Sequence, residues 1–256
     1  MKISNTVLKA EKNSKKIAIV LTIIFACLIL INFIIISIIF SWADWISLLI
    51  FSLLTIFPAY ISNASMVITG GGKPIDGGRY FRDGRRILGD HKTWNGLKGP
   101  LYIGIPISFF IFFLFIISWL PIKELIILAS NQGEYILYDN IKIFQYYFIG
   151  GSFPFNFLVL FIRIVFSSYG AVVGDLFGSF LKRRFDIKSG APFWIVDQLD
   201  FALGALLFIS IPGFISPYLF LLPDFFIITF LIILTPAVSI IANTIAYMIH
   251  LKDVPW

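Results

Sequence analysis

The sequence predicts an all-α polytopic membrane protein with six transmembrane helices and both termini in the cytoplasm. The chain of 256 residues is 59% hydrophobic and only 13% charged, and its mean hydropathy is +0.92. Several uninterrupted apolar runs exceed the roughly 20 residues that a helix needs to cross a bilayer. Their apolarity is continuous and does not alternate along the run, which excludes a transmembrane β-barrel.

Six apolar segments are predicted to span the membrane: 17–40, 45–68, 101–120, 154–182, 192–211 and 225–249. Lysines precede the first segment, but its apolar core is too long for a signal peptide and no small-residue cleavage site follows, so we expect a retained helix. Residues 121–142 carry several acids and are too polar to span. The aromatic stretch 143–153 is compatible with either an interfacial or a re-entrant position.

Basic residues set the predicted orientation. Five lysines precede the first segment, seven Lys and Arg lie in 69–100, four lie in 182–188, and Lys252 follows the last segment. The opposite side carries two lysines between its apolar segments. By the positive-inside rule, both termini and the loops 69–100 and 183–191 are cytoplasmic. The net charge of +6 therefore describes a basic membrane face, and no nucleic-acid partner is expected.

Few soft metal ligands are available in this chain. Cys27 is the only cysteine, so an intrachain disulfide is impossible. The two histidines, His91 and His250, are too few for a histidine-rich metal site. Any bound metal ion is therefore expected to have mainly oxygen ligands.

The loop at 69–100 combines many glycines with both signs of charge. Glycines allow backbone amides to approach a phosphate group closely, and neighbouring Lys and Arg residues supply countercharge. A solvated positive-inside loop would explain the basic residues but not the glycines and interspersed acids. We therefore favour a folded anion-binding loop, although it lacks the GxxxxGK[ST] pattern of a Walker loop.

Acids and bases also meet where the fourth and fifth segments return to one membrane face. Four polar residues share one face of the fourth segment, at i, i+4, i+7 and i+8: Asp175, Ser179, Lys182 and Arg183. The fifth segment adds Asp197 and Asp200 as i, i+3 neighbours. Antiparallel helices joined by a short loop would bring the three carboxylates to similar depth.

Three carboxylates at one depth repel each other unless a cation or a strong donor intervenes. Mg²⁺ binds through a few carboxylates, retained waters and substrate phosphates. For each aspartate alone, an ion pair with a nearby Lys or Arg is about as good an explanation. Together with the adjacent basic loop, a site for a metal ion and phosphate explains the group better, since phosphoryl-type chemistry needs mainly charge neutralisation and positioning.

Other polar and small residues support weaker predictions. Asn63 is expected either to face the same cavity or to make an interhelical hydrogen bond. Gly170, Gly174 and Gly178 recur every fourth residue and predict close packing against a neighbouring helix. Arg163 lies in the outer half of its segment and is expected to extend towards the outer interface.

Two motifs resemble those of known membrane cytidylyltransferases. The residues S-F-L-K-R at 179–183, then Lys188 and D-Q-L-D at 197–200, resemble the signature of CTP:phosphatidate cytidylyltransferases, S-x-x-K-R-x4-K-D followed by D-R-x-D. This chain departs from the signature, because Ser189 replaces the acid, Gln198 replaces the arginine, and a Pro-Gly-His-Gly-Gly stretch is absent.

The departures point to the archaeal branch of this group. The segments 63–65, 70–76, 81–94 and 174–184 closely resemble CDP-archaeol synthases, and the likeness extends over most of residues 58–250. Members of that family typically have five spans. Residues 1–44, a polar tail and one helix, therefore look like an addition to a cytidylyltransferase-like membrane domain at 45–256.

The resemblance implies a reaction and a cofactor. CTP and 2,3-bis-(O-geranylgeranyl)-glycerol 1-phosphate would give the CDP-lipid and pyrophosphate, with Mg²⁺ as cofactor. The metal ligands and catalytic carboxylates would be Asp175, Asp197 and Asp200. Lys182 and Arg183 would neutralise the phosphates. The other expected substrate-binding residues are Asn63, Gly71, Gly72, Lys73, Asp76, Arg82, Asp83, Arg85, Arg86, Asp90, Lys92, Ser179 and Lys188.

Rival functions remain open at the level of sequence. An ester-lipid phosphatidate cytidylyltransferase would share this mechanism and differ only in its lipid. An ion-coupled transporter would be expected to show internal symmetry and paired broken helices, and neither is visible. A non-catalytic scaffold gives no reason for the clustered aspartates. The expected location is the cell membrane, with CTP arriving from the cytoplasm, and the sequence is compatible with a homo-oligomer.

Overall fold

The structure is a computed structural model, and it describes residues 5–187 and 193–250. Its helices are α1 (Asn5–Ile39), α2 (Trp42–Ile68), α3 (Trp94–Gly99), the π-helical turn η1 (Pro100–Gly104), α4 (Ile105–Ile117), α5 (Trp119–Asn131), α6 (Ile141–Ile149), α7 (Asn156–Arg184), α8 (Trp194–Ile215) and α9 (Phe225–Met248). The described residues contain no β-strand, only two isolated β-bridges in the loop before α3. The all-helical prediction is confirmed.

Six of these helical segments are long and apolar enough to cross a membrane, as predicted. The third begins at Trp94 instead of residue 101, because α3, η1 and α4 follow one another without a break. The Thr93 hydroxyl caps the start of α3 by accepting from the Gly96 N–H at 3.2 Å. Pro100, which has no N–H to donate, begins the π-helical turn.

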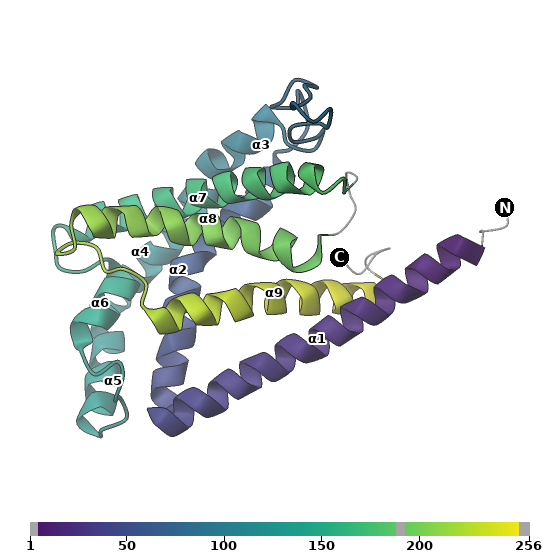
Figure 1. The fold of residues 1–256 in the computed structure, drawn as a ribbon. Helices are drawn as coiled ribbons and strands as arrows, with labels where there is room; N and C mark the ends of the chain where they lie inside the picture. The colour runs from purple at the N-terminus through teal and green to yellow at the C-terminus, as the bar shows by residue number, and fades with distance from the viewer. Residues whose placement is uncertain (1–4, 188–192, 251–256) are drawn as a thin grey trace.

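The antiparallel pair α7 and α8 forms the tightest contact in the bundle. A Cβ at Gly170 would lie 2.7 Å from the Gly204 carbonyl oxygen, and a Cβ at Gly204 would lie 2.7 Å from the Gly174 Cα. Any larger residue at these positions would push the two backbones apart, so the packing role predicted for the glycine repeat holds. In Figure 1, α9 runs beside this pair and α2 crosses behind it.

The N-terminal helix α1 packs along α9 and the start of α2 (Figure 1). Phe25 lies against Ala237 and Ile240, and the Thr22 hydroxyl donates to that of Thr244 at 3.1 Å. Closer to the end of α1, Asn32 accepts from the indole N–H of a tryptophan on α2 at 3.0 Å. Polar contacts at the middle and in the second half of α1 therefore fix its register on the bundle, while the side chains on its outer face are exposed.

Arg163 differs from its prediction. Instead of reaching outwards, it is buried on α7, where its guanidinium donates to the Tyr146 carbonyl at 2.7 Å and lies over the rings of Phe112 and Tyr146. The physical reason is the position of α6, which ends at the depth of Arg163. The carbonyls of Tyr146 and Tyr147, in the last turn of α6, both accept from the guanidinium, and that of Tyr146 also accepts the Gly150 N–H at 2.9 Å.

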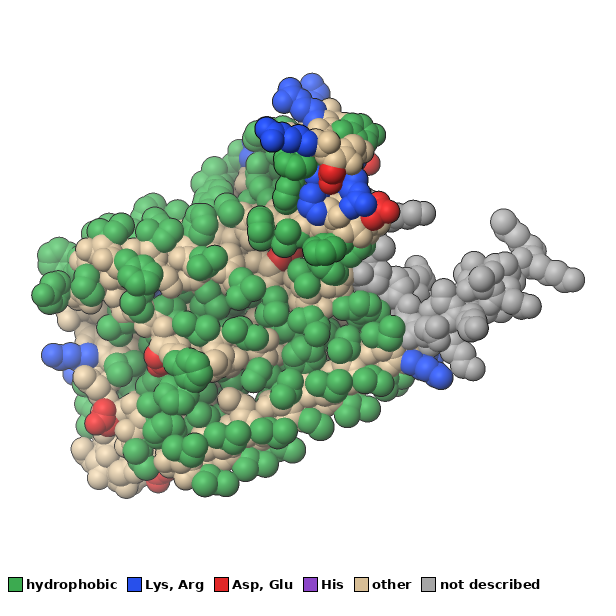
Figure 2. All heavy atoms as spheres, viewed as in Figure 1, with side chains coloured by type: hydrophobic (Ala, Val, Ile, Leu, Met, Phe, Trp, Pro, Cys, Tyr) green, Lys and Arg blue, Asp and Glu red, His purple; other side chains and the backbone are tan. Residues whose placement is uncertain are grey.

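Polar and apolar surfaces are separated along the bundle. The body is covered mainly by hydrophobic side chains, while Lys and Arg gather on the projecting loop near α3 (Figure 2). In Figure 1, that loop lies towards the same side of the bundle as the first turns of α1 and α8 and the last turns of α7 and α9. This is the distribution expected of a membrane protein with one functional face.

Candidate active site

The loop between α2 and α3 is folded around one buried carboxylate. The Asp76 side chain has no exposed surface and pairs with Arg86 at 2.9 Å. Its oxygens also accept backbone N–H groups of Gly78, Leu88 and Gly89 at 3.0–3.1 Å. Burial alone would raise the pKa of Asp76, but the Arg86 and backbone donors outweigh it and hold the pKa well below its usual 3.8. We therefore interpret Asp76 as the organiser of the loop instead of a direct substrate contact.

The folded loop closes a polar pocket of about 220 Å³ against the ends of α7 and α8. Its lining residues come from all three segments: Leu88, Gly89, His91, Lys92, Asp175, Ser179, Lys182, Arg183, Asp197 and Asp200. All five residues predicted to be catalytic are present, together with two of the predicted substrate-binding residues, Ser179 and Lys92. The helical spacing explains the α7 residues, because i, i+4 and i+7 positions share one face.

Two lysines neutralise two of the three carboxylates. Lys92 pairs with Asp175 at 2.6 Å, and Lys182 pairs with Asp197 at 2.7 Å. Asp200 differs, because no cationic side chain in the described part of the chain pairs with it. Among the described residues, the one hydrogen bond to its carboxylate comes from the N–H of the next residue, and it lies within electrostatic range of Lys92 as well as of the other two carboxylates.

Asp200 fits against α7 because that helix has glycines at the point of contact. A Cβ at Gly178 would lie 2.7 Å from the Cβ and Cγ of Asp200. At Gly174, a Cβ would lie 2.9 Å from the backbone carbonyl carbon of Asp200. The glycine repeat thus does more than bring two helices together, since it also makes room for a carboxylate in the pocket.

The donor set is chemically suited to a hard divalent cation, because carboxylate oxygens are the ligands that Mg²⁺ prefers. As they stand, however, no three acidic, His or Cys side chains among residues 5–187 and 193–250 are grouped closely enough to hold a metal ion. The lysine pairs draw Asp175 and Asp197 towards separate partners. Mg²⁺ at this site therefore stays a prediction, with Asp200 as the carboxylate that forms no ion pair with any described residue.

Most of the other predicted loop residues lie away from the pocket. Those that do not line it are Asn63, Gly71, Gly72, Lys73, Asp76, Arg82, Asp83, Arg85, Arg86 and Asp90. Asn63 is half-buried on α2, Lys73 and Arg82 are exposed, and Arg86 bridges Asp76 and Asp90 within the loop. Lys188 lies outside the described residues.

Sequence reasoning passed over some residues that the structure places at or beside the site. Leu88, Gly89 and His91 line the pocket. Of these three, His91 alone had a signal in the sequence, namely its position beside Lys92 in a glycine-rich loop. Arg184 was also missed, although it continues the basic run of α7. Its side chain pairs with Asp83 at 2.8 Å and so joins the loop to the helix.

An apolar cavity of about 360 Å³ lies on the other side of Asp200. Side chains of α7 and α8 form it, among them Phe177, Leu203 and Phe208. Asp200 and Gly178 line this cavity, and Asp200 also lines the polar pocket. The Asp200 carboxylate therefore lies at the boundary between the polar pocket and the apolar cavity.

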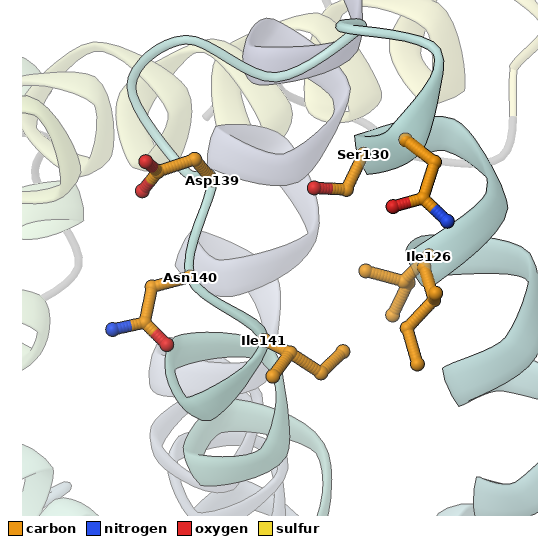
Figure 3. Close-up of a pocket in the computed structure, with 7 residues that line it drawn as sticks. Ile126, Ser130, Asp139, Asn140 and Ile141 are labelled. Carbon is orange, nitrogen blue, oxygen red and sulfur yellow. The ribbon is translucent and has the colours of Figure 1, made fainter.

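A larger cavity, about 440 Å³, lies at the opposite end of the molecule between α5 and the segment before α6. Asp139 and Asn140 point away from α5, whereas Ile141 points towards Ile126 (Figure 3). Asp139 is the one ionisable residue in its lining, and Asn140 caps α6 by accepting the Lys142 N–H at 2.9 Å. Size alone does not make this cavity a site, and we place the candidate active site at the polar pocket.

The sequence of this chain is similar to those of known proteins. A family model described as CarS-like, CDP-archaeol synthase, matches residues 45–256. The CDP-archaeol synthase of Methanosarcina barkeri is 38% identical over 206 residues, covering 78% of this chain and 99% of that protein. The synthase of Thermococcus onnurineus is 37% identical over 215 residues, covering 84% and 96%, and that of Methanococcus aeolicus is 39% identical over 213 residues, covering 82% and 98%.

One solved structure is also similar. It was described as giving structural insight into an intramembrane enzyme for archaeal membrane lipids biosynthesis, and it is 26% identical, covers 77% of this chain and 92% of its own, and has a TM-score of 0.41. The sequence relationships decide the assignment, because the family model and the relatives together cover nearly all of α2 to α9. This chain belongs to the CDP-archaeol synthase family.

Proposed function

We propose that this chain transfers CMP from CTP to an unsaturated archaeal ether-lipid phosphate, 2,3-bis-(O-geranylgeranyl)-glycerol 1-phosphate, and releases pyrophosphate. Family membership supports the reaction class. The observation that supports the proposal at the level of residues is the position of Asp200, which borders both a charged pocket and an apolar cavity. A nucleotide and a lipid can meet only where such spaces adjoin.

The polar pocket would hold the triphosphate of CTP. Its three carboxylates and three basic side chains are formally balanced, so a bound triphosphate needs additional positive charge. Mg²⁺ held by Asp175, Asp197 and Asp200 would supply that charge and withdraw electron density from the phosphates. Lys92, Lys182 and Arg183 line the same pocket and would neutralise the phosphate oxygens and the departing pyrophosphate.

The apolar cavity would receive the lipid from the side, with its phosphate near Asp200. An oxygen of the lipid phosphate would attack the α-phosphorus of CTP, while the bond from that phosphorus to the bridging oxygen of the β-phosphate breaks. Both electrons of the broken bond leave with pyrophosphate, and no covalent enzyme intermediate is required. The protein's part is to hold the two phosphates in line and neutralise their charge, which is the usual demand of phosphoryl transfer.

The active site would face the cytoplasm, where CTP is made. Basic residues support this orientation, since loops rich in Lys and Arg stay on the cytoplasmic side. The polar pocket lies between two such segments, the loop before α3 and the last turn of α7. The same orientation would place the Asp139 cavity outside.

The decisive experiment uses purified protein in vesicles, with CTP labelled at the α-phosphate and either the ether-lipid phosphate or phosphatidate. Transfer of label to the ether lipid, and its loss on chelation of Mg²⁺, are the expected results. Preference for phosphatidate would instead select the ester-lipid reaction. Asp200→Asn should abolish transfer, whereas Asp139→Asn, a matched change at an exposed carboxylate, should leave it intact. Transfer by Asp200→Asn at the wild-type rate would remove Asp200 from the mechanism.

A further inference from the structure

We propose that Arg184 is a positioning residue, which fixes the loop before α3 in the conformation that completes the nucleotide pocket. The inference rests on the proposed function, because it concerns how the CTP site is assembled. Arg184 does not line the pocket itself. It acts through the loop, from the last turn of α7, directly after Lys182 and Arg183.

Arg184 contacts the loop through nearly every part of its guanidinium group. One terminal nitrogen pairs with Asp83 at 2.8 Å, and the other donates to the backbone carbonyls of Arg85 and Arg86. The group also packs against two aromatic rings that meet edge to face, 4.8 Å from the centroid of Phe81 in the loop and 4.8 Å from that of Phe180. A planar, permanently charged group with several donors suits this position, and a lysine does not.

A short series of hydrogen bonds and ion pairs connects Arg184 to the pocket. Arg184 holds the backbone of Arg86, whose side chain pairs with the buried Asp76. Asp76 in turn accepts the backbone N–H groups of Leu88 and Gly89, and both of these residues line the pocket. The segment then continues into Lys92, which pairs with Asp175. Releasing the tip of the loop would therefore release the wall of the pocket.

A direct contact between Arg184 and a CTP phosphate is the competing explanation, and the geometry disfavours it. Both terminal nitrogens already donate to loop acceptors, the group packs against two aromatic rings, and its Nε is buried. Arg183, by contrast, lines the pocket. The two neighbouring arginines thus divide the tasks, one facing the substrate and the other holding the loop.

The experiment compares Arg184→Ala and Arg184→Lys with Arg79→Ala. Arg79 is a matched control, because it is an exposed arginine of the same loop whose side chain makes no hydrogen bond or ion pair in the described part of the chain. Hydrogen exchange of residues 76–92 reports loop docking, and steady-state kinetics with saturating lipid give KM for CTP and kcat separately. We expect Arg184→Ala to speed exchange in the loop and to raise KM for CTP at least about tenfold, with kcat within about threefold of wild type. Arg184→Lys should recover part of both effects, and Arg79→Ala should change neither.

Either of two exchange results in Arg184→Ala would overturn the inference: unchanged loop exchange, or faster exchange with an unchanged KM for CTP. A fall in kcat alone would also count against it, since that pattern indicates direct catalytic contact. If Arg184→Ala fails to fold, Asp83→Ala decides, because it removes one partner of Arg184 on the loop and leaves α7 intact. Wild-type protein that does not turn over CTP would refute the proposed function, a result separate from any difference among these variants.

Discussion

A single methyl group at Gly178 should impair catalysis far more than folding. The Cβ of Gly178→Ala would lie 2.7 Å from both Cβ and Cγ of Asp200. Non-bonded carbon atoms prefer separations of about 3.5–4.0 Å, so the Asp200 side chain has to move by about 1 Å. The nearest atoms that this Cβ would meet are Oδ2, Cβ and Cγ of Asp200. The carboxyl group can rotate away about the Cα–Cβ bond, but the Cβ of Asp200 is fixed to its backbone, so α7 and α8 also have to move apart slightly.

The two effects of this change differ in size. Overpacking typically costs about 1–3 kcal/mol, and replacing Gly by Ala within a helix returns about 0.5–1 kcal/mol, so the net loss of stability should stay below about 2.5 kcal/mol. A displacement of about 1 Å in a reacting group can lower a rate about a hundredfold. We therefore expect a folded variant of Gly178→Ala whose kcat is lower by about two orders of magnitude.

The assay measures CDP-lipid formation at saturating CTP and lipid, with thermal unfolding followed in parallel. Gly174→Ala is the contrasting variant, because its Cβ would meet only backbone atoms of Asp200 and Phe201, with the Asp200 carbonyl carbon at 2.9 Å, so no part of the clash can be relieved by side-chain rotation. That variant should lose stability together with activity. Gly178→Ala with kcat within about threefold of wild type would show that the position of the Asp200 carboxylate is not critical, and the proposed mechanism would fall with it.

Four further predictions follow from other contacts. Lys92→Met should weaken CTP binding about tenfold and strengthen Mn²⁺ binding without nucleotide, since Asp175 loses its counter-ion; unchanged binding of both ligands would contradict the role of this ion pair. The pKa of Asp76 is lowered in the folded loop, so the stability that this carboxylate contributes is complete above its usual pKa of 3.8 and is lost only as pH falls further. Hydrogen exchange of the loop, corrected for its intrinsic pH dependence, should therefore show constant protection from pH 8 to 5; weaker protection within that window would be the contrary result. Arg163→Met should cost about 1–3 kcal/mol of stability without changing KM for CTP, because the carbonyls of Tyr146 and Tyr147 lose a charged donor; an altered KM would instead link Arg163 to the site. Deletion of residues 1–40 should lower the unfolding temperature but preserve turnover, and loss of turnover in a folded truncated protein would show that α1 takes part in catalysis.

The membrane architecture was predictable because it depends on contiguous residues. A bilayer requires long apolar helices whatever their neighbours are, and six such segments are visible in the sequence. The spacing of Asp175, Ser179 and Lys182 also followed from the helix period alone. The start of the third span was misplaced, because the polar turn of α3 carries no apolar signal although it is continuous with α4.

The candidate site was only partly predictable. The carboxylates and Lys182 were found because charges are unusual beside apolar segments, which makes them visible in a single sequence. The loop residues were not sorted correctly by composition, which treats every Lys, Arg and Asp alike. Whether one of them faces the pocket, as Lys92 does, or the loop interior, as Asp76 does, depends on how the loop folds.

By itself, the sequence of this protein determined how many helices cross the membrane and which polar residues share a helical face, because both are properties of neighbouring residues. Only the tertiary structure decided the partners of the charged groups. Arg184 and Asp83 are 101 residues apart in the chain, and Lys92 and Asp175 are 83 apart. No local pattern specifies such pairs, because a charge takes whichever partner the folded backbone brings within reach.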